Sequence, residues 1–185
     1  HNTAANLSGI AAKDGKLYIS LRLSQEIVVY DASDMKVLKR WSIPKPAGLT
    51  FNQQGQLLAI SGKTVVIVDL NSGKTSPLID SDLKAPVGIA TNKAGDIFVS
   101  DWADAQCVKV FSPKGKFLRT VGKPGGRNWL GAFDADGMLM PRQIAVDKND
   151  RLWVAENDNF PRRISAWDSN SGKLIDDFVG STTYG

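Results

Sequence analysis

The sequence is poor in the residues on which most catalysis and metal binding depend. Its 185 residues include one histidine, His1, and one cysteine, Cys107. A histidine general base and a histidine-ligated metal are therefore nearly excluded, and no internal disulfide can form. The motifs Gly-x-Ser-x-Gly, His-Glu-x-x-His and Cys-x-x-Cys are also missing. This composition does not favour an enzyme, and we expect Cys107 to be a small, partly buried residue.

Long hydrophobic runs are missing as well. No stretch approaches the roughly 20 apolar residues that a membrane-spanning helix needs, and no secretory signal peptide is visible. The net charge is +4. A mildly basic chain of this kind permits an anionic partner without implying one.

The chain does contain an internal repeat. Four segments share an apolar first strand, a tight polar turn and three further short strands. Their equivalent apolar positions, Ile10, Leu49, Ile89 and Ile144, lie 39, 40 and 55 residues apart. Four short strands in roughly 40 residues are typical of a β-propeller blade. The sequence therefore predicts an all-β propeller with four visible four-stranded antiparallel blades. We expect the blades at about 8–42, 46–80, 86–122 and 141–180, with an insertion at 123–140.

The third repeat is the most regular. It reads Pro86-Val-Gly-Ile-Ala, then Ile97-Phe-Val-Ser-Asp, then Val108-Lys-Val-Phe-Ser-Pro-Lys-Gly-Lys-Phe-Leu-Arg-Thr-Val-Gly. This pattern resembles the NHL-repeat β-propeller family, more loosely in repeats one and two. The chain departs from the family pattern at Ala105–Cys107, where a histidine step is usual, and at Gln143, which replaces a glycine.

The resemblance has consequences for the ring. NHL propellers are typically six-bladed, so we expect four blades to form an incomplete or truncated ring within a larger propeller. An open ring exposes strand edges and an apolar blade face. The resemblance therefore implies a longer parent chain or self-association through the open blade edges. We expect the parent to be extracellular or periplasmic.

Propeller loops place the candidate binding residues together. Links between blades and links from second to third strands emerge at one face of a propeller. The second kind of link includes Asp101–Asp104, Glu156–Pro161, Arg22 and Lys63. Loops on a rigid scaffold are where binding chemistry usually lies. The residues expected to bind a ligand are Trp102, Arg127, Trp129, Phe133, Arg142 and Asn157.

The insertion 123–140 has two interpretations. Trp129 and Phe133 offer flat apolar surfaces, and Arg127 offers a forked donor, so the loop could hold a ligand over the propeller mouth. Alternatively, the two aromatic side chains pack onto the neighbouring blade.

Carboxylates on the same face provide weak candidates for a metal site. These are Asp101, Asp104, Glu156 and Asp158, whose oxygens suit a divalent ion such as calcium. The segment Asp134–Gly137 resembles the start of a calcium loop but lacks the later ligands, which favours a capped turn. We expect no cofactor, with calcium as the alternative.

Basic residues gather between Cys107 and Arg142, where seven positive side chains face only Asp134 and Asp136. Lys114 and Lys116 belong to an outer turn, away from Arg142, so these charges are scattered and argue against nucleic acid.

The sequence thus favours a non-catalytic module that recognises a protein, peptide or carbohydrate through its loop-rich face. The first alternative is a metal-assisted hydrolase or lyase, and the second is a single-stranded RNA-binding protein.

Overall fold

The computed structural model describes residues 7–128, 132–157 and 161–180 and contains sixteen β-strands and no helix within them. Blade 1 comprises β1 (Leu7–Lys13), β2 (Lys16–Leu21), β3 (Glu26–Asp31) and β4 (Val37–Ser42). Blade 2 comprises β5 (Pro46–Phe51), β6 (Leu57–Ser61), β7 (Thr64–Val68) and β8 (Thr75–Ile79). Blade 3 comprises β9 (Pro86–Thr91), β10 (Ile97–Asp101), β11 (Cys107–Phe111) and β12 (Phe117–Val121). Blade 4 comprises β13 (Pro141–Val146), β14 (Arg151–Glu156), β15 (Arg163–Asp168) and β16 (Leu174–Val179).

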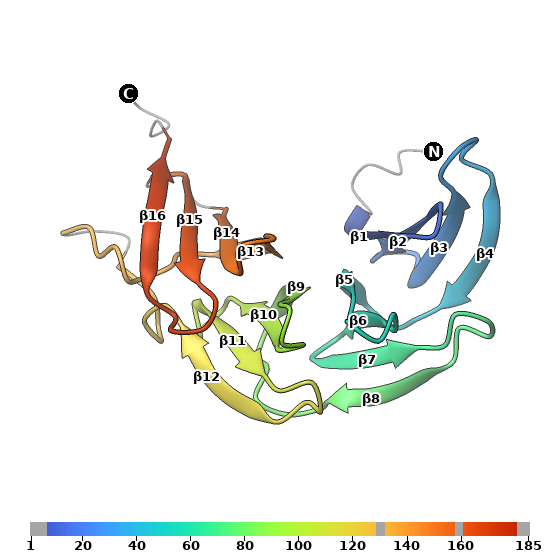
Figure 1. Cartoon of the computed structure of the whole chain (residues 1–185), viewed down its shortest axis with the longest axis horizontal. Helices are drawn as coiled ribbons and strands as arrows, with labels where there is room; N and C mark the ends of the chain where they lie inside the picture. The colour runs from blue at the N-terminus through green and yellow to red at the C-terminus, as the bar shows by residue number, and fades with distance from the viewer. Residues whose placement is uncertain (1–6, 129–131, 158–160, 181–185) are drawn as a thin grey trace.

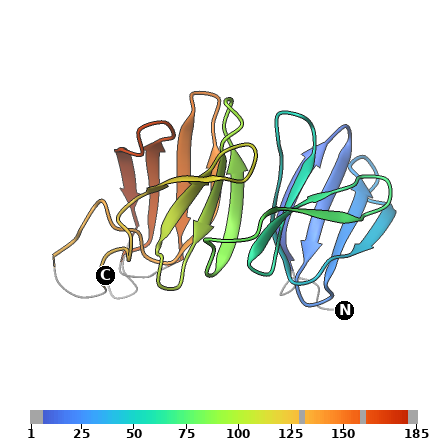
Figure 2. The ribbon, with the colours of Figure 1, turned by 90° about the horizontal axis from the view of Figure 1, so that it is seen from below.

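Each blade is one antiparallel sheet whose strands follow chain order. The four sheets form an open arc, with β1, β5, β9 and β13 innermost (Figure 1). These inner strands contact one another in series, β1 with β5, β5 with β9 and β9 with β13. Figure 2 shows the sheets from the side, with hairpins gathered at the two ends of the strands. The predicted all-β propeller with four four-stranded blades is confirmed.

Hairpin turns use residues that tolerate a left-handed backbone. Gly55, Gly95 and Gly115 have φ values of 74°, 88° and 82°. A glycine reaches this region without steric cost, so these turns close the strands tightly.

The hydrophobic core lies between blades. Tyr18 and Trp41 of blade 1 pack against Leu57 of blade 2, and equivalent clusters join blades 2 and 3 and blades 3 and 4. Trp167 belongs to the last of these clusters and is 1% exposed. Alternating side chains of each strand point to opposite faces of a sheet. Blades 2 and 3, which have a neighbour on each side, therefore each contribute to two clusters.

Glycines on the inner strands allow the blades to approach closely. A Cβ atom on Gly48 would lie 2.7 Å from the carbonyl oxygen of Val87, and one on Gly88 would collide with the carbonyl oxygen of Arg142. A Cβ atom on Gly9 would likewise collide with the carbonyl oxygen of Ala47. The inner strands therefore pack backbone to backbone, which larger residues would prevent.

The two end blades carry exposed apolar side chains. Ile10 of blade 1 is 63% exposed, and Ile164 and Phe178 of blade 4 are 49% and 55% exposed. Self-association through these blades remains a prediction. No helix in the described segments is long and apolar enough to span a membrane.

Candidate functional site

Backbone hydrogen bonds build one end of the propeller, which we call the mouth. In blades 2, 3 and 4, the residue after the second strand donates its N–H to the residue just before the first strand. The pairs are Gly62 to Lys45 (3.1 Å), Trp102 to Ala85 (3.3 Å) and Asn157 to Met140 (3.0 Å). These bonds hold the inter-blade links beside the links from second to third strands. Loops of both kinds therefore meet at the mouth, as the propeller pattern predicts.

A cavity of about 430 Å³ opens at the mouth. We call it the mouth pocket; its lining residues are Arg22, Lys45, Gly62, Lys63, Lys84, Ala85, Pro86, Val87, Trp102 and Arg142. Half of these residues are cationic and none is acidic. Within the described residues, none of the five cations forms an ion pair. Unopposed positive charge in a concave site raises the local concentration of anions.

Trp102 and Arg142 form the best-defined contact in the mouth pocket. The guanidinium carbon of Arg142 lies 4.7 Å from the centroid of the Trp102 ring, a cation–π geometry. Both residues are half-buried. The buried Nε of Arg142 has no hydrogen-bond partner within the described residues. The pair therefore presents a stacked, partly desolvated cation beside a flat aromatic surface.

The backbone at Arg142 is fixed by the neighbouring blade. The buried hydroxyl of Ser100 donates to the carbonyl oxygen of Arg142 at 2.6 Å and accepts the N–H of Gly88 at 2.8 Å. Because Gly88 lacks a side chain, blade 4 can approach closely enough for this bond. Ser100 and Gly88 thus fix the position of the Arg142 backbone at the mouth.

Asp101 anchors another part of the mouth. Its fully buried carboxylate accepts the backbone N–H groups of Lys84 and Ala85, at 3.0 and 2.6 Å for the shortest bonds. The Lys109 ammonium lies 2.8 Å from the same carboxylate. Asp101 therefore fixes the link that carries Lys84, and its charge is neutralised by Lys109 rather than by the mouth cations.

Arg127 lies away from the mouth pocket, in a buried cluster. Its guanidinium donates to Glu156 and to the carbonyl oxygen of Gly137. Arg163 reaches the same two residues, at 3.4 and 3.1 Å. Phe133 lies over both guanidinium groups, at 5.4 Å from each, and is 49% exposed. These contacts hold Arg127, Phe133 and Gly137 of the insertion against blade 4.

Glu156 is the acidic centre of that cluster. Burial raises the pKa of Glu156 from its ordinary value, while Arg127, the Leu139 N–H and Arg163 oppose the shift. The carboxylate also accepts the Leu139 N–H at 2.8 Å. With two guanidinium groups around one carboxylate, Glu156 acts as a structural counter-ion in this fold.

The remaining candidates are dispersed. Asn157 lines a separate cavity of about 720 Å³ beside blade 4, together with Phe178. Asp104 is exposed, and Trp129 and Asp158 lie outside the described residues. Among residues 7–128, 132–157 and 161–180, no group of three or more His, Cys, Asp or Glu side chains could hold a metal ion. Asp101 and Glu156 are instead paired with cations in different parts of the structure.

The segment Asp134–Gly137 forms a turn. The Asp134 carboxylate accepts the Asp136 N–H at 3.1 Å and pairs with Lys123 at 2.8 Å. The Asp134 carbonyl accepts the Gly137 N–H at 3.1 Å. These bonds are those of a capped turn. The sequence favours the same arrangement, because the segment lacks the later ligands of a calcium loop.

Cys107 is 1% exposed, and burial raises the pKa of its thiol to about 11. A buried, protonated thiol is a poor nucleophile. Cys107 therefore acts as a small buried side chain that packs at the start of β11.

Sequence reasoning missed Lys45 and Lys84. Both lie in inter-blade links, immediately before or close to the proline that opens a first strand. That position could have placed them at the mouth, because those links emerge there. Lys45 has a φ of 45°, a left-handed backbone held by the bond from Gly62.

Neither a protein-family model nor a curated protein sequence matches this chain. The NHL-repeat assignment therefore remains a prediction. Solved structures do share the fold. The hydrazine synthase of Kuenenia stuttgartiensis has a TM-score of 0.70 and 16% identity over 95% of this chain and 49% of its own.

Virginiamycin B lyase from Staphylococcus aureus has a TM-score of 0.66 and 19% identity, over 98% of this chain and 57% of the lyase. A chain in a nidogen–laminin complex has a TM-score of 0.58 and 15% identity, over 93% of this chain and 79% of its own. The chain thus spans about half the length of the synthase and the lyase. At these identities the likeness establishes the propeller fold alone.

Proposed function

We propose that this chain is a non-catalytic recognition module that binds an acidic protein segment, peptide or carbohydrate at the mouth pocket. The observation that carries the proposal is the group of five cations without acidic partners around Trp102. Binding sites on rigid scaffolds are commonly concave and lined by an aromatic surface with a few charged groups. The mouth pocket has both features.

The chemistry of the two kinds of residue is complementary. Arginine and lysine attract carboxylate, sulfate or phosphate, and arginine adds a forked hydrogen-bonding geometry. The Trp102 ring offers an apolar platform on which a sugar face or a side chain can stack. Because Asp101 is neutralised by Lys109 at 2.8 Å, it does not cancel the field of the mouth cations.

The main rival is a metal-assisted lyase or hydrolase, and the likeness to virginiamycin B lyase is its motivation. The buried carboxylates Asp101 and Glu156 serve as ion-pair partners. This pairing supports recognition over metal-assisted catalysis, as does the presence of a similar fold in a nidogen–laminin complex.

The test is a binding screen with defined probes. The purified chain is applied to arrays of acidic peptides, neutral and anionic oligosaccharides, and single-stranded RNA, at two salt concentrations. Trp102→Ala and Arg142→Gln remove the central contact, and Lys114→Gln is the control because Lys114 lies in an exposed outer turn. We expect acidic peptides or anionic oligosaccharides to bind, with affinity lowered at least tenfold by either mouth substitution.

Two results would contradict the proposal. Equal binding by the native chain, Trp102→Ala and Arg142→Gln would place the site elsewhere. If only RNA binds, with a steep salt dependence, and Arg142→Gln weakens that binding, the mouth pocket would be a nucleic-acid site.

A further inference from the structure

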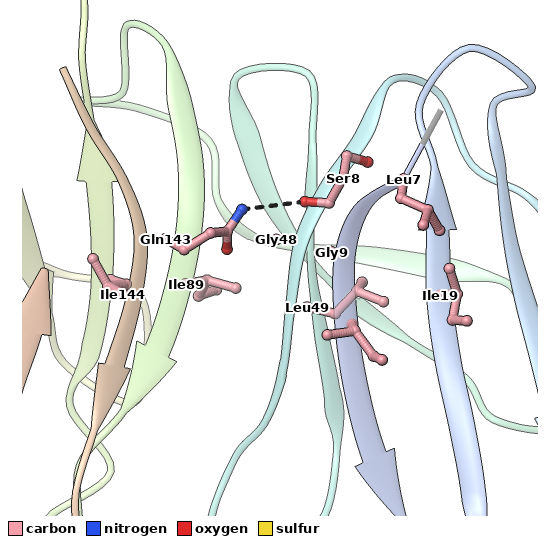
Figure 3. Close-up of a pocket in the computed structure, with 10 residues that line it drawn as sticks. Leu7, Ser8, Gly9, Ile19, Gly48, Leu49, Ile89, Gln143 and Ile144 are labelled. Carbon is pink, nitrogen blue, oxygen red and sulfur yellow. Dashed lines mark hydrogen bonds between the residues drawn. The ribbon is translucent and has the colours of Figure 1, made fainter. Parts of the chain in front are cut away.

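A second cavity lies deeper along the propeller axis. It has a volume of about 500 Å³, and we call it the axial pocket. Its lining residues are Leu7, Ser8, Gly9, Ile10, Ile19, Gly48, Leu49, Ile89, Gln143 and Ile144. Figure 3 shows these side chains around the space between β1, β5, β9 and β13. None of the lining residues is charged.

Two strands contribute residues to both the mouth pocket and the axial pocket. On β9, Val87 lines the mouth pocket and Ile89 lines the axial pocket. On β13, Arg142 lines the mouth pocket and Ile144 lines the axial pocket. Two residues along a strand span about 7 Å. A ligand anchored at Arg142 is therefore within a few bond lengths of an apolar space.

Gln143 makes blade 4 differ from the other blades at this level. The equivalent residues are Gly9, Gly48 and Gly88, each of which faces the backbone of the next blade. The Gln143 amide instead donates across the axial pocket to the carbonyl oxygen of Ser8, at a long 3.5 Å (Figure 3). Such a long bond is weak, so the amide can turn aside or bind a ligand atom at little cost.

We propose that the mouth and axial pockets form one site for an anionic amphiphile. A carboxylate, sulfate or phosphate group lies among the mouth cations beside Trp102, and an extended apolar chain lies between Leu49, Ile89 and Ile144. This inference rests on the anion binding at the mouth pocket that the proposed function assigns, and it adds a further ligand class to that same pocket. The volume of the axial pocket falls in the range of small-molecule sites, roughly 300–1,000 Å³.

The apolar part of the ligand has a measurable signature. Burial of one methylene group favours binding by about 0.8 kcal/mol, which is close to a fourfold gain in affinity. An open pocket captures part of that gain, so we expect about two- to fourfold tighter binding per added methylene. The anionic part predicts that a carboxylate binds more tightly than the alcohol of equal length, and that salt reduces the difference.

The experiment is a calorimetric titration of the native chain with acetate, hexanoate, octanoate and decanoate, below their micelle concentrations, and with octanol. We expect affinity to rise along the carboxylate series and octanoate to bind at least tenfold more tightly than octanol.

Two pairs of variants locate the site. Ile10→Asp places a negative charge in the axial pocket at a residue that is 63% exposed, so the fold tolerates it. Leu38→Asp is its control, on the outer strand of the same blade and 45% exposed. Arg142→Gln and its control Lys114→Gln test the mouth. We expect Ile10→Asp and Arg142→Gln to weaken decanoate binding at least tenfold, and both controls to bind as the native chain does.

The outcomes separate the two proposals. If acidic peptides bind in a manner sensitive to Trp102→Ala while decanoate binds no more tightly than acetate, the amphiphile site is wrong and the recognition function stands. Equal decanoate affinity in Ile10→Asp and Leu38→Asp would also overturn the amphiphile site. If neither peptides, oligosaccharides nor carboxylates bind in a manner sensitive to the mouth substitutions, both proposals fail.

Discussion

Gly88→Ala is the substitution that most directly perturbs the framework behind the mouth. A Cβ atom at this position would lie closer than 3.0 Å to the carbonyl oxygen of Arg142, and 3.1 Å from the Ile144 nitrogen. Those atoms are backbone of β13, so they can yield only if blade 4 shifts away from blade 3. Overpacking of this kind costs about 1–3 kcal/mol.

The shift would have a second cost. It would lengthen the 2.6 Å bond from the Ser100 hydroxyl to the Arg142 carbonyl, and Ser100 is fully buried. A buried polar group that loses its partner costs about 1–3 kcal/mol. We therefore expect Gly88→Ala to lower the free energy of unfolding by about 2–6 kcal/mol.

The assay is urea-induced unfolding followed by tryptophan fluorescence. Gln143→Ala is the matched control, because it makes the same small side chain at the equivalent position of blade 4 and removes only one bond of 3.5 Å. The control should change the free energy of unfolding by less than about 1 kcal/mol. Equal destabilisation by Gly88→Ala and Gln143→Ala would refute the argument that backbone approach at Gly88 positions Arg142.

Two further predictions concern titratable groups. The Cys107 thiol, with its pKa raised to about 11 by burial, should not react with a thiol reagent at pH 8 until the chain is unfolded; rapid reaction of the folded chain would contradict its burial. Hydrogen bonds from the Arg151 N–H and the Trp153 indole lower the pKa of Asp147, so its contribution to stability is present above about pH 4 and is lost as the pH falls further. Asp147→Asn should therefore flatten the fall in stability between about pH 5 and pH 3, and an unchanged acid profile would show that these bonds do not act on stability.

The fold was predictable because its signals are local and repeated. Each repeat contains short strand segments such as Ile97–Asp101 and turn residues such as Gly95, which predict a strand and a hairpin. The spacing between equivalent residues such as Leu49 and Ile89 gives the length of a blade. Each signal is weak by itself, but four repeats agree. The resulting propeller pattern also placed Trp102 and Arg142 at one end, where the structure brings them to 4.7 Å.

The partners of individual charges were not predictable in this way. Arg127 is a predicted ligand-binding residue, and the sequence did not indicate that it pairs with Glu156, which lies 29 residues away. Asp101 is a candidate metal ligand, and the sequence did not indicate that it accepts two backbone N–H groups and pairs with Lys109. Both arrangements depend on how links from different strands meet in space, and no periodicity in the sequence encodes that.

The recognition site can be tested most directly by a two-dimensional ¹H–¹⁵N NMR titration with an octapeptide of glutamate at low salt. The indole N–H of Trp102 reports on the mouth pocket. That of Trp167, which donates to the Ser165 hydroxyl at 2.8 Å inside the core, is the internal control. We expect the Trp102 signal to move on titration, the Trp167 signal to stay fixed, and Arg142→Gln to abolish the change. A Trp102 signal that stays fixed while the peptide binds would contradict the claim that the mouth pocket is the binding site.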